Sequence, residues 1–211
     1  MNLPRRQATS IPWMLCSAAF ALLAVPVLLM AGPPVTIATP IRSSDAGGAR
    51  LIAAVKAGRM DSIHALIRDG VDIDVTVPGD GTALTTAARA GDLDIVNELL
   101  RLGADVDQAS RGDGNPLIMA ASKPGNLAVV ERLVCAGADV NAVMTDDETP
   151  LINAARSGDL RVVRYLVEHG ADVDLGVAVT VHSQARVWRS PLNQARTVAI
   201  RNYLIAHGAT R

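Results

Sequence analysis

Residues 82–107, TALTTAARAGDLDIVNELLRLGADVD, decide how this chain folds, because their pattern occurs twice more in register. Residues 116–141 read PLIMAASKPGNLAVVERLVCAGADVN, and residues 149–174 read TPLINAARSGDLRVVRYLVEHGADVD. One glycine marks the same place in successive units, with spacings of 33, 34 and 33 residues: Gly70, Gly103, Gly137 and Gly170. A period of this length is typical of a stack of small units, each of which buries its apolar face against the next.

Each unit carries the pattern of two helices. The second helix has apolar residues at i, i+1, i+4 and i+5, as in Ile95, Val96, Leu99 and Leu100, which predicts one buried stripe. The repeated glycine supplies the left-handed conformation that ends this helix. Polar residues stand at the predicted N-cap positions: Asp92, Asn126 and Asp159. The first helix is shorter and carries an alanine pair that allows close stacking: Ala87–Ala88, Ala120–Ala121 and Ala154–Ala155.

These three motifs resemble ankyrin repeats, and a divergent copy and a shortened copy flank them. The resemblance implies an all-α repeat solenoid in which each repeat has a β-hairpin finger, an inner helix and an outer helix. We expect four to five repeats, the last one a C-terminal cap: 51–81, 82–115, 116–149, 150–190 and 191–211. The last copy lacks three residues relative to the one before it, so we expect its helices to be shorter. Arg201 replaces a repeated valine in its second helix, which suits the outer face of a terminal repeat.

The N-terminal part of the chain has a different character. We expect residues 1–10, with Arg5 and Arg6, to be a cytoplasmic basic region before an apolar segment at 11–31. This segment is long enough for one hydrophobic helix, which is either a transmembrane anchor or a cleaved signal peptide, or else a buried helix of a soluble domain. The first two alternatives both put the repeats outside the cytoplasm, in the cell envelope or secreted. Residues 32–50 are rich in Pro, Gly and Ser and predict a flexible linker.

The sequence offers no pattern for bond chemistry. Zinc-protease, phosphate-loop and nucleophile-elbow motifs are absent, and the four histidines do not pair at metal-ligand spacing. The acidic pairs Asp105/Asp107 and Asp172/Asp174 lack the other ligands of a calcium loop, so we assign them to turn backbone. A net charge of −1 gives no basic excess for nucleic acid. We therefore expect no enzyme activity, no cofactor, no metal, no nucleic acid and no small-molecule substrate.

Charged residues recur on the predicted fingers and at the ends of the inner helices. The resemblance implies that fingers and inner helices together form a concave face that binds proteins. The inner-helix ends supply a basic row, one residue per repeat: Lys56, Arg89, Lys123 and Arg156. The fingers add further candidate contacts: Arg111, Asp113, Asp146, Asp147 and Glu148. A basic row beside acidic fingers would steer and orient a charged partner, but exposed turns of this kind also prefer polar residues for structural reasons alone.

The fourth finger is longer than the others. From Val173 to Pro191 the separation is eighteen residues, whereas the equivalent separation in the other repeats is ten. Alternating residues on both sides of a polar turn predict an extended hairpin over 175–190. Arg186, Trp188 and Arg189 on its returning arm are residue types that dominate binding hot spots. Trp188 either contacts a partner or packs within its own hairpin and over the shortened cap.

Together these patterns predict a non-enzymatic protein-binding module, with a membrane contact through residues 11–31 if that segment is retained. The alternative is the sensor or regulatory arm of a membrane protein complex, in which the apolar helix pairs with another helix. Small residues in that segment would allow such close contact: Ser17, Ala18, Ala19 and Ala21.

Overall fold

The computed structural model describes residues 45–110, 112–144, 148–180 and 186–210. Within these ranges no helix combines the length and the apolar character needed to cross a bilayer. The predicted basic region at 1–10, the predicted hydrophobic helix at 11–31 and most of the predicted linker lie outside the described residues.

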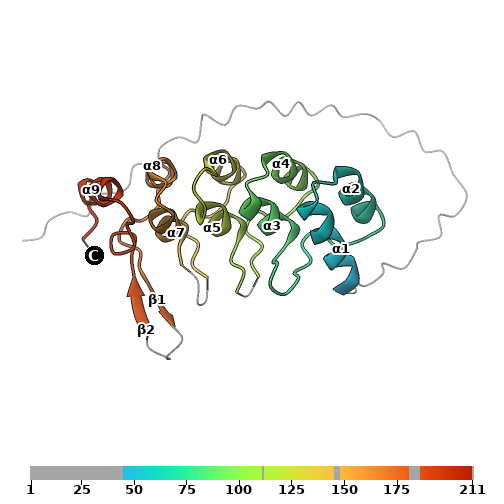
Figure 1. Cartoon of the computed structure of the whole chain (residues 1–211), viewed down its shortest axis with the longest axis horizontal. Coiled ribbons are helices and arrows are strands. Elements are labelled where there is room, and N and C mark those ends of the chain that lie inside the picture. Colours follow the sequence, from blue (N-terminus) through green and yellow to red (C-terminus); the bar gives the residue numbers. More distant parts are fainter. Residues whose placement is uncertain (1–44, 111, 145–147, 181–185, 211) are drawn as a thin grey trace, which may run out of the picture. The chain divides into compact units, whose positions relative to one another are not determined.

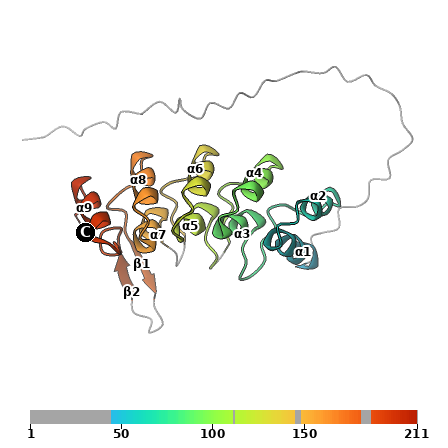
Figure 2. The same cartoon turned by 45° about the horizontal axis from the view of Figure 1, so that its top comes forward.

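The described part of the chain is a stack of helix pairs. Inner helices follow one another in one row, and outer helices form a second row that contacts the first (Figures 1 and 2). The inner row contains α1 (Asp45–Lys56), α3 (Ala83–Ala90), α5 (Pro116–Ala121) and α7 (Pro150–Ser157). The outer row contains α2 (Met60–Arg68), α4 (Leu93–Arg101), α6 (Leu127–Cys135), α8 (Leu160–Glu168) and α9 (Val198–Ala206). Four helix pairs and a terminal single helix agree with the four to five repeats expected from the sequence.

Side-chain caps set where most of these helices begin. The inner helices α3, α5 and α7 begin after a residue whose side chain accepts the backbone N–H three residues later: Thr82, Asn115 and Thr149. Asp92 and Asp159 cap the outer helices α4 and α8 as predicted. The prediction for Asn126 was wrong, because its side chain does not cap α6. Its Nδ2 instead donates to the Ala88 and Ala120 carbonyl oxygens, each at 3.3 Å, and so joins two repeats.

The core runs along the stack between the two rows. The predicted apolar stripe is buried at three of its four positions in α4, α6 and α8, and Val96, Leu99, Val130 and Leu133 have no exposed surface. The fourth position is half-buried, as at Leu100. The predicted alanine pairs of α3, α5 and α7 are also fully buried, so their small side chains let neighbouring inner helices pack closely. Burial of each large aliphatic side chain contributes about 1.5–3 kcal/mol.

The repeated GADVD segment links each repeat to the next by hydrogen bonds. Within a repeat, the Asp105 carboxylate accepts the Asp107 backbone N–H at 3.0 Å, and Asp172 and Asp174 repeat this contact at 2.9 Å. Between repeats, the Asp107 carboxylate accepts the Asp139 N–H at 3.2 Å. The same link joins the other repeats, from Asp74 to Asp105, from Asn141 to Asp172 and from Asp174 to Thr210. This arrangement confirms that the acidic pairs serve turn backbone.

The first helix begins earlier than the sequence suggested. We assigned residues 32–50 to a linker, but α1 already begins at Asp45. Gly47 and Gly48, which favoured the linker prediction, lie in this helix and face the first finger. A Cβ atom at Gly48 would lie 3.1 Å from side-chain atoms of both Val75 and Val77. The glycine therefore permits a close helix–finger contact rather than chain flexibility.

The last repeat is shortened in only one of its two helices. Residues 191–194 form a turn where the earlier repeats have an inner helix, so the missing residues come from that position. The prediction was wrong for the outer helix, because α9 has nine residues, the same length as α4, α6 and α8. Arg201 is exposed on α9, as expected of a terminal position.

The predicted long finger is a β-hairpin. Strand β1 (Val177–Thr180) pairs antiparallel with β2 (Arg186–Arg189), with Val177 opposite Arg189 and Thr180 opposite Arg186. The hairpin extends beyond the other fingers on the same side of the stack (Figure 1). Among the described residues, the first two fingers carry isolated bridges, Val77 to Gly81 and Ser110 to Gly114, and no strand. The polar turn at 181–185 lies outside the described residues.

Candidate functional site

The predicted basic row and the acidic fingers meet in the first two repeats. Lys56 Nζ at the end of α1 lies 2.5 Å from Asp80 Oδ1 on the following finger. One repeat later, Arg89 Nη2 lies 3.5 Å from Asp113 Oδ1. Asp113 also accepts the Gly79 backbone N–H at 3.1 Å, so it joins two fingers as well as a finger and a helix. These pairs neutralise charges that the sequence pattern had offered to a partner.

The third finger uses a different contact. Its Glu148 is only 3% exposed and stands where the first two fingers have Gly81 and Gly114. Arg156 Nη1 of α7 approaches Glu148 Oε1 to 2.8 Å, and Arg189 Nη1 of β2 binds the same oxygen. One buried carboxylate therefore ties the long finger to the end of an inner helix.

Four other predicted contact residues belong to the second and third repeats, and the structure describes one of them. Lys123 is exposed and forms no ion pair with any residue that the structure describes. Arg111, Asp146 and Asp147 lie outside the described residues. In sequence, Asp147 follows Lys123 by 24 residues, the same separation that joins Lys56 to Asp80.

The long finger presents Arg186 and Trp188 on one face. Side chains alternate along a strand, and the register puts Ala178 and Thr180 of β1 on that same face. All four residues are exposed, and Trp188 is 50% exposed. The Trp188 ring lies against Gly176, where a Cβ atom would come within 2.5 Å of ring carbon Cζ2. Trp188 therefore packs on its own hairpin, as one of the two alternatives predicted, and its contact with a partner stays a prediction.

Sequence reasoning missed one column of residues on the inner helices and on the turn that replaces the last of them. Each lies two positions after the repeated leucine, an offset that could have identified them: Ala53, Thr86, Met119, Asn153 and Gln194. Thr86 and Asn153 are buried and bond locally, with Thr86 donating to the Asp80 carbonyl at 2.9 Å. Ala53 is exposed, and Met119 and Gln194 are half-buried, so this column contributes to the surface beside the fingers.

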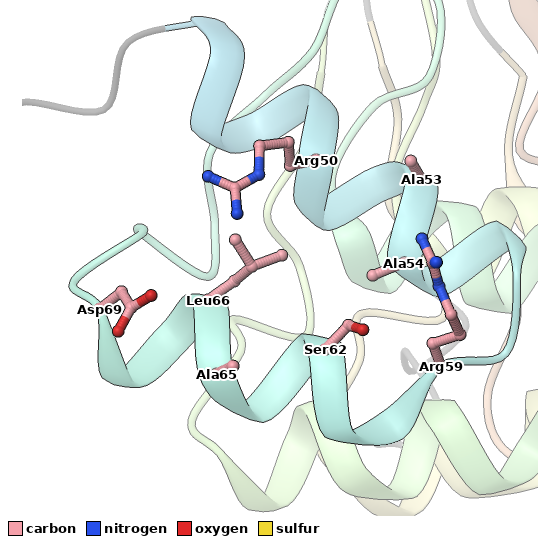
Figure 3. A pocket seen from close by; sticks show the side chains of 8 residues that line it. All are labelled: Arg50, Ala53, Ala54, Arg59, Ser62, Ala65, Leu66 and Asp69. Carbon is pink, nitrogen blue, oxygen red and sulfur yellow. The ribbon is translucent and has the colours of Figure 1, made fainter.

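Both ends of the stack expose polar side chains, and the last helix also exposes a valine. At the first repeat a hollow of about 250 Å³ lies between α1 and α2 (Figure 3). Alanine side chains and Leu66 form its floor, and Arg50 and Asp69 flank it. Ser62 lines it at the position that Ile95 fills, buried, in the next repeat. This end therefore has the polar surface of a terminal repeat. At the other end Val198 of α9 is 72% exposed.

Four carboxylates have perturbed pKa values. Hydrogen bonds from Arg101 and then His64 lower the pKa of Glu98 to about 2. Burial raises the pKa of Asp74 and of Asp107 above the ordinary value, although each accepts a backbone N–H that opposes the shift. Burial opposes the shift at Asp159, but hydrogen bonds from Arg161 and from the Gly125 N–H lower its pKa. All four serve contacts between repeats. In the described ranges, no three His, Cys, Asp or Glu side chains are grouped to hold a metal ion.

Comparison with protein families identifies the architecture. A model described as "Ankyrin repeats (3 copies)" matches residues 51–144 and 117–209. The chain is a member of the ankyrin-repeat family. No curated protein matches it. Ankyrin repeats are protein-interaction modules, so a protein partner is the class of ligand that this fold indicates.

In this ankyrin-repeat protein, exposed large apolar side chains gather late in the chain. Among the described residues, all five follow the first two fingers: Val143, Val187, Trp188, Val198 and Ile205. Val143 belongs to the third finger, and Val187 and Trp188 belong to the long finger. The early fingers are engaged in contacts within the molecule, whereas the late fingers keep apolar surface.

Proposed function

We propose that this ankyrin-repeat protein binds a protein partner through its fingers and inner helices and carries out no bond chemistry. The observation that supports this function most directly is the exposure of Val143, Val187 and Trp188 on adjacent fingers. Exposed apolar side chains on a rigid frame are the usual basis of protein recognition. The ion pairs and hydrogen bonds between repeats hold that frame, so little order is lost on binding.

A photo-crosslinking residue tests this function at two matched positions. Position 143 lies on the third finger, and position 128 is an exposed alanine on the outer helix α6. We expect crosslinks to a distinct protein from position 143 and none from position 128. Equal crosslinking from both positions, or none from position 143, would contradict binding through the fingers.

We further propose that the repeats are displayed on the outer side of the cytoplasmic membrane or exported. Arg5 and Arg6 before the apolar residues 11–31 support this orientation. An intact mass of the mature protein distinguishes a retained anchor from a cleaved signal peptide. A reporter that is active only outside the cytoplasm, fused after residue 211, tests the orientation, and an inactive fusion would contradict it.

A second candidate function is that of a sensor or regulatory arm in a membrane complex. It is favoured by the small residues Ser17, Ala18, Ala19 and Ala21, which would permit close helix contact. Replacement of all four by leucine should then reduce helix association in a membrane assay. Unchanged association would leave the binding module as the better account.

A further inference from the structure

Charge is strongly segregated along the repeats. Residues 51–174 contain 11 basic and 20 acidic side chains, a net charge of −9. Residues 175–211 contain no Asp or Glu and five arginines, a net charge of +5: Arg186, Arg189, Arg196, Arg201 and Arg211. The long finger begins at this boundary, so it is the first part of the stack in which basic side chains outnumber acidic ones.

Half of the ten described basic residues before this boundary form ion pairs. Lys56 and Arg89 pair with finger carboxylates, and Arg101 and Arg161 pair with Glu98 and Asp159 on the outer side. Beyond the boundary Arg189 shares Glu148 with Arg156, so two guanidinium groups face one carboxylate. Arg186 is exposed and pairs with no acidic group in the described part of the chain. It is the uncompensated cation of the long finger.

The hairpin places Arg186 and Trp188 on the same face, two positions apart on β2. We name the exposed side of the hairpin, formed by Ala178, Thr180, Arg186 and Trp188, the hairpin face. Its two large side chains both come from β2, and the small side chains of β1 stand opposite them. The Trp188 ring therefore flanks an open strip of sheet rather than a packed layer.

The hairpin face is fixed before any partner arrives. Contact with Gly176 orients the Trp188 ring, and Asn193 Nδ2 donates to the Trp188 carbonyl at 3.1 Å. On the opposite side of the sheet, Val179 is 5% exposed and Arg189 binds Glu148. A preformed site of this kind loses little conformational entropy on binding.

We propose that the hairpin face binds a short acidic segment of the partner protein, with a carboxylate at Arg186 and an apolar side chain against Trp188. This proposal rests on the proposed function and specifies the chemistry of the partner. A short acidic segment interacts mainly with the positive charge close to the hairpin face. Charges farther away than the Debye length, which is about 8 Å at physiological salt, are largely screened. Nucleic acid and an anionic bilayer are larger polyanions, so they would also lie near the preceding repeats, whose net charge is −9. Repulsion between these like charges disfavours both as partners.

Selection from a random 12-residue peptide library on the purified full chain tests the proposal. We expect the enriched peptides to carry Asp or Glu next to an apolar residue. Synthetic copies should bind at least tenfold more weakly to Arg186→Glu and to Trp188→Ala. Arg201→Glu is the matched control, because it makes the same charge change at an exposed arginine of α9 and should alter binding less than twofold. Copies with Asn and Gln in place of Asp and Glu should lose binding.

Several outcomes would overturn the proposal. They are no enrichment, enriched peptides without acidic residues, equal loss in Arg201→Glu, and tighter binding to phosphatidylserine vesicles or a 20-base DNA than to the peptides. Circular dichroism and the urea midpoint establish that each variant is folded. If the partner crosslinked from position 143 still binds Arg186→Glu and Trp188→Ala normally, the hairpin-face proposal fails while the proposed function stands.

Discussion

Arg189 of the long finger and Arg156 of α7 bind the same oxygen of a buried glutamate, Glu148. The hairpin is thereby joined to the repeat before it. Replacement of Arg189 by alanine leaves Glu148 with one guanidinium instead of two, so we expect the free energy of unfolding to fall by about 1–2 kcal/mol. Urea denaturation measures this loss. Arg186→Ala, an exposed position on the same strand, should change it by less than about 0.5 kcal/mol.

A double-mutant cycle isolates this contact. Glu148→Gly introduces the residue that the first two fingers have at this position. In that background Arg189→Ala should cost little, because the arginine no longer has its buried partner. An equal cost of Arg189→Ala with and without Glu148 would show that the arginine stabilises the hairpin by another contact.

Gly176 controls the position of Trp188. A methyl group at Gly176 would lie 2.5 Å from Trp188 Cζ2 and 2.8 Å from the Arg189 carbonyl oxygen, so Gly176→Ala must displace the ring. We expect a red-shifted Trp188 emission in a Trp13→Phe background, where Trp188 is the single tryptophan. Unchanged emission would mean that the ring does not rest on Gly176. Thr180→Ala, on the same face of β1 but opposite Arg186, is the control and should leave the emission unchanged.

Replacement by alanine should change the stability of the protein differently at two adjacent glycines of α1. A Cβ at Gly47 would make an ordinary 3.4 Å contact with Val71, so Gly47→Ala should stabilise the protein by about 0.5–1 kcal/mol. At Gly48 the added methyl would meet Val75 and Val77 at 3.1–3.2 Å, which offsets the gain in helix propensity. The melting temperature of Gly47→Ala should therefore be higher than that of Gly48→Ala. The reverse order would contradict the close packing of α1 on the first finger.

These glycines show where sequence reasoning reached its limit. The repeat spacing, the buried stripes, most of the caps and the long hairpin follow from local periodicity, so they could be predicted. A glycine that permits close packing and a glycine in a linker look the same until the neighbouring finger is in place. Likewise, Asn126 has the right residue type for a cap, but the adjacent repeat offers its amide two carbonyl oxygens.

The prediction of the candidate site was limited by the same dependence on contacts between repeats. The sequence identified Arg89 and Glu148 as partner contacts because both belong to charged rows. The fold then pairs Arg89 with Asp113 and buries Glu148 under two arginines. Only contacts across repeats determine which charges are left for a partner. The sequence named both Arg186 and Arg189 as candidate contacts, but it could not show that Glu148 binds Arg189 and leaves Arg186 unpaired among the described residues.

Glu98 should make the stability of the first two repeats depend on pH. Hydrogen bonds from Arg101 and His64 lower its pKa from 4.5 to about 2, so the folded state favours the ionised form. The stabilisation is complete above pH 4.5 and is lost as the pH falls towards 2. Glu98→Gln should therefore lower the urea midpoint at pH 7 and have a smaller effect at pH 3. Glu131→Gln on the exposed side of α6 is the control, and a pH-independent effect of Glu98→Gln would contradict the linkage.

Asp107 should show the opposite pH dependence. Burial raises its pKa above 3.8, so ionisation is less favourable in the folded state, and stability falls as the pH rises through the raised value. The next repeat has Asn141 at the same position, where its Oδ1 accepts the Asp172 N–H at 2.8 Å. Asp107→Asn should therefore keep the hydrogen bond to Asp139 and raise the free energy of unfolding at pH 7. The gain should be less than about 1 kcal/mol, because solvent screens a carboxylate that is only partly buried. The gain should vanish below pH 3.8.

The reverse change, Asn141→Asp, should lower stability at pH 7, and urea denaturation of both variants at pH 7 and pH 3.5 measures the pair. Destabilisation by Asp107→Asn at pH 7 would mean that the charged hydrogen bond outweighs the cost of burying the carboxylate.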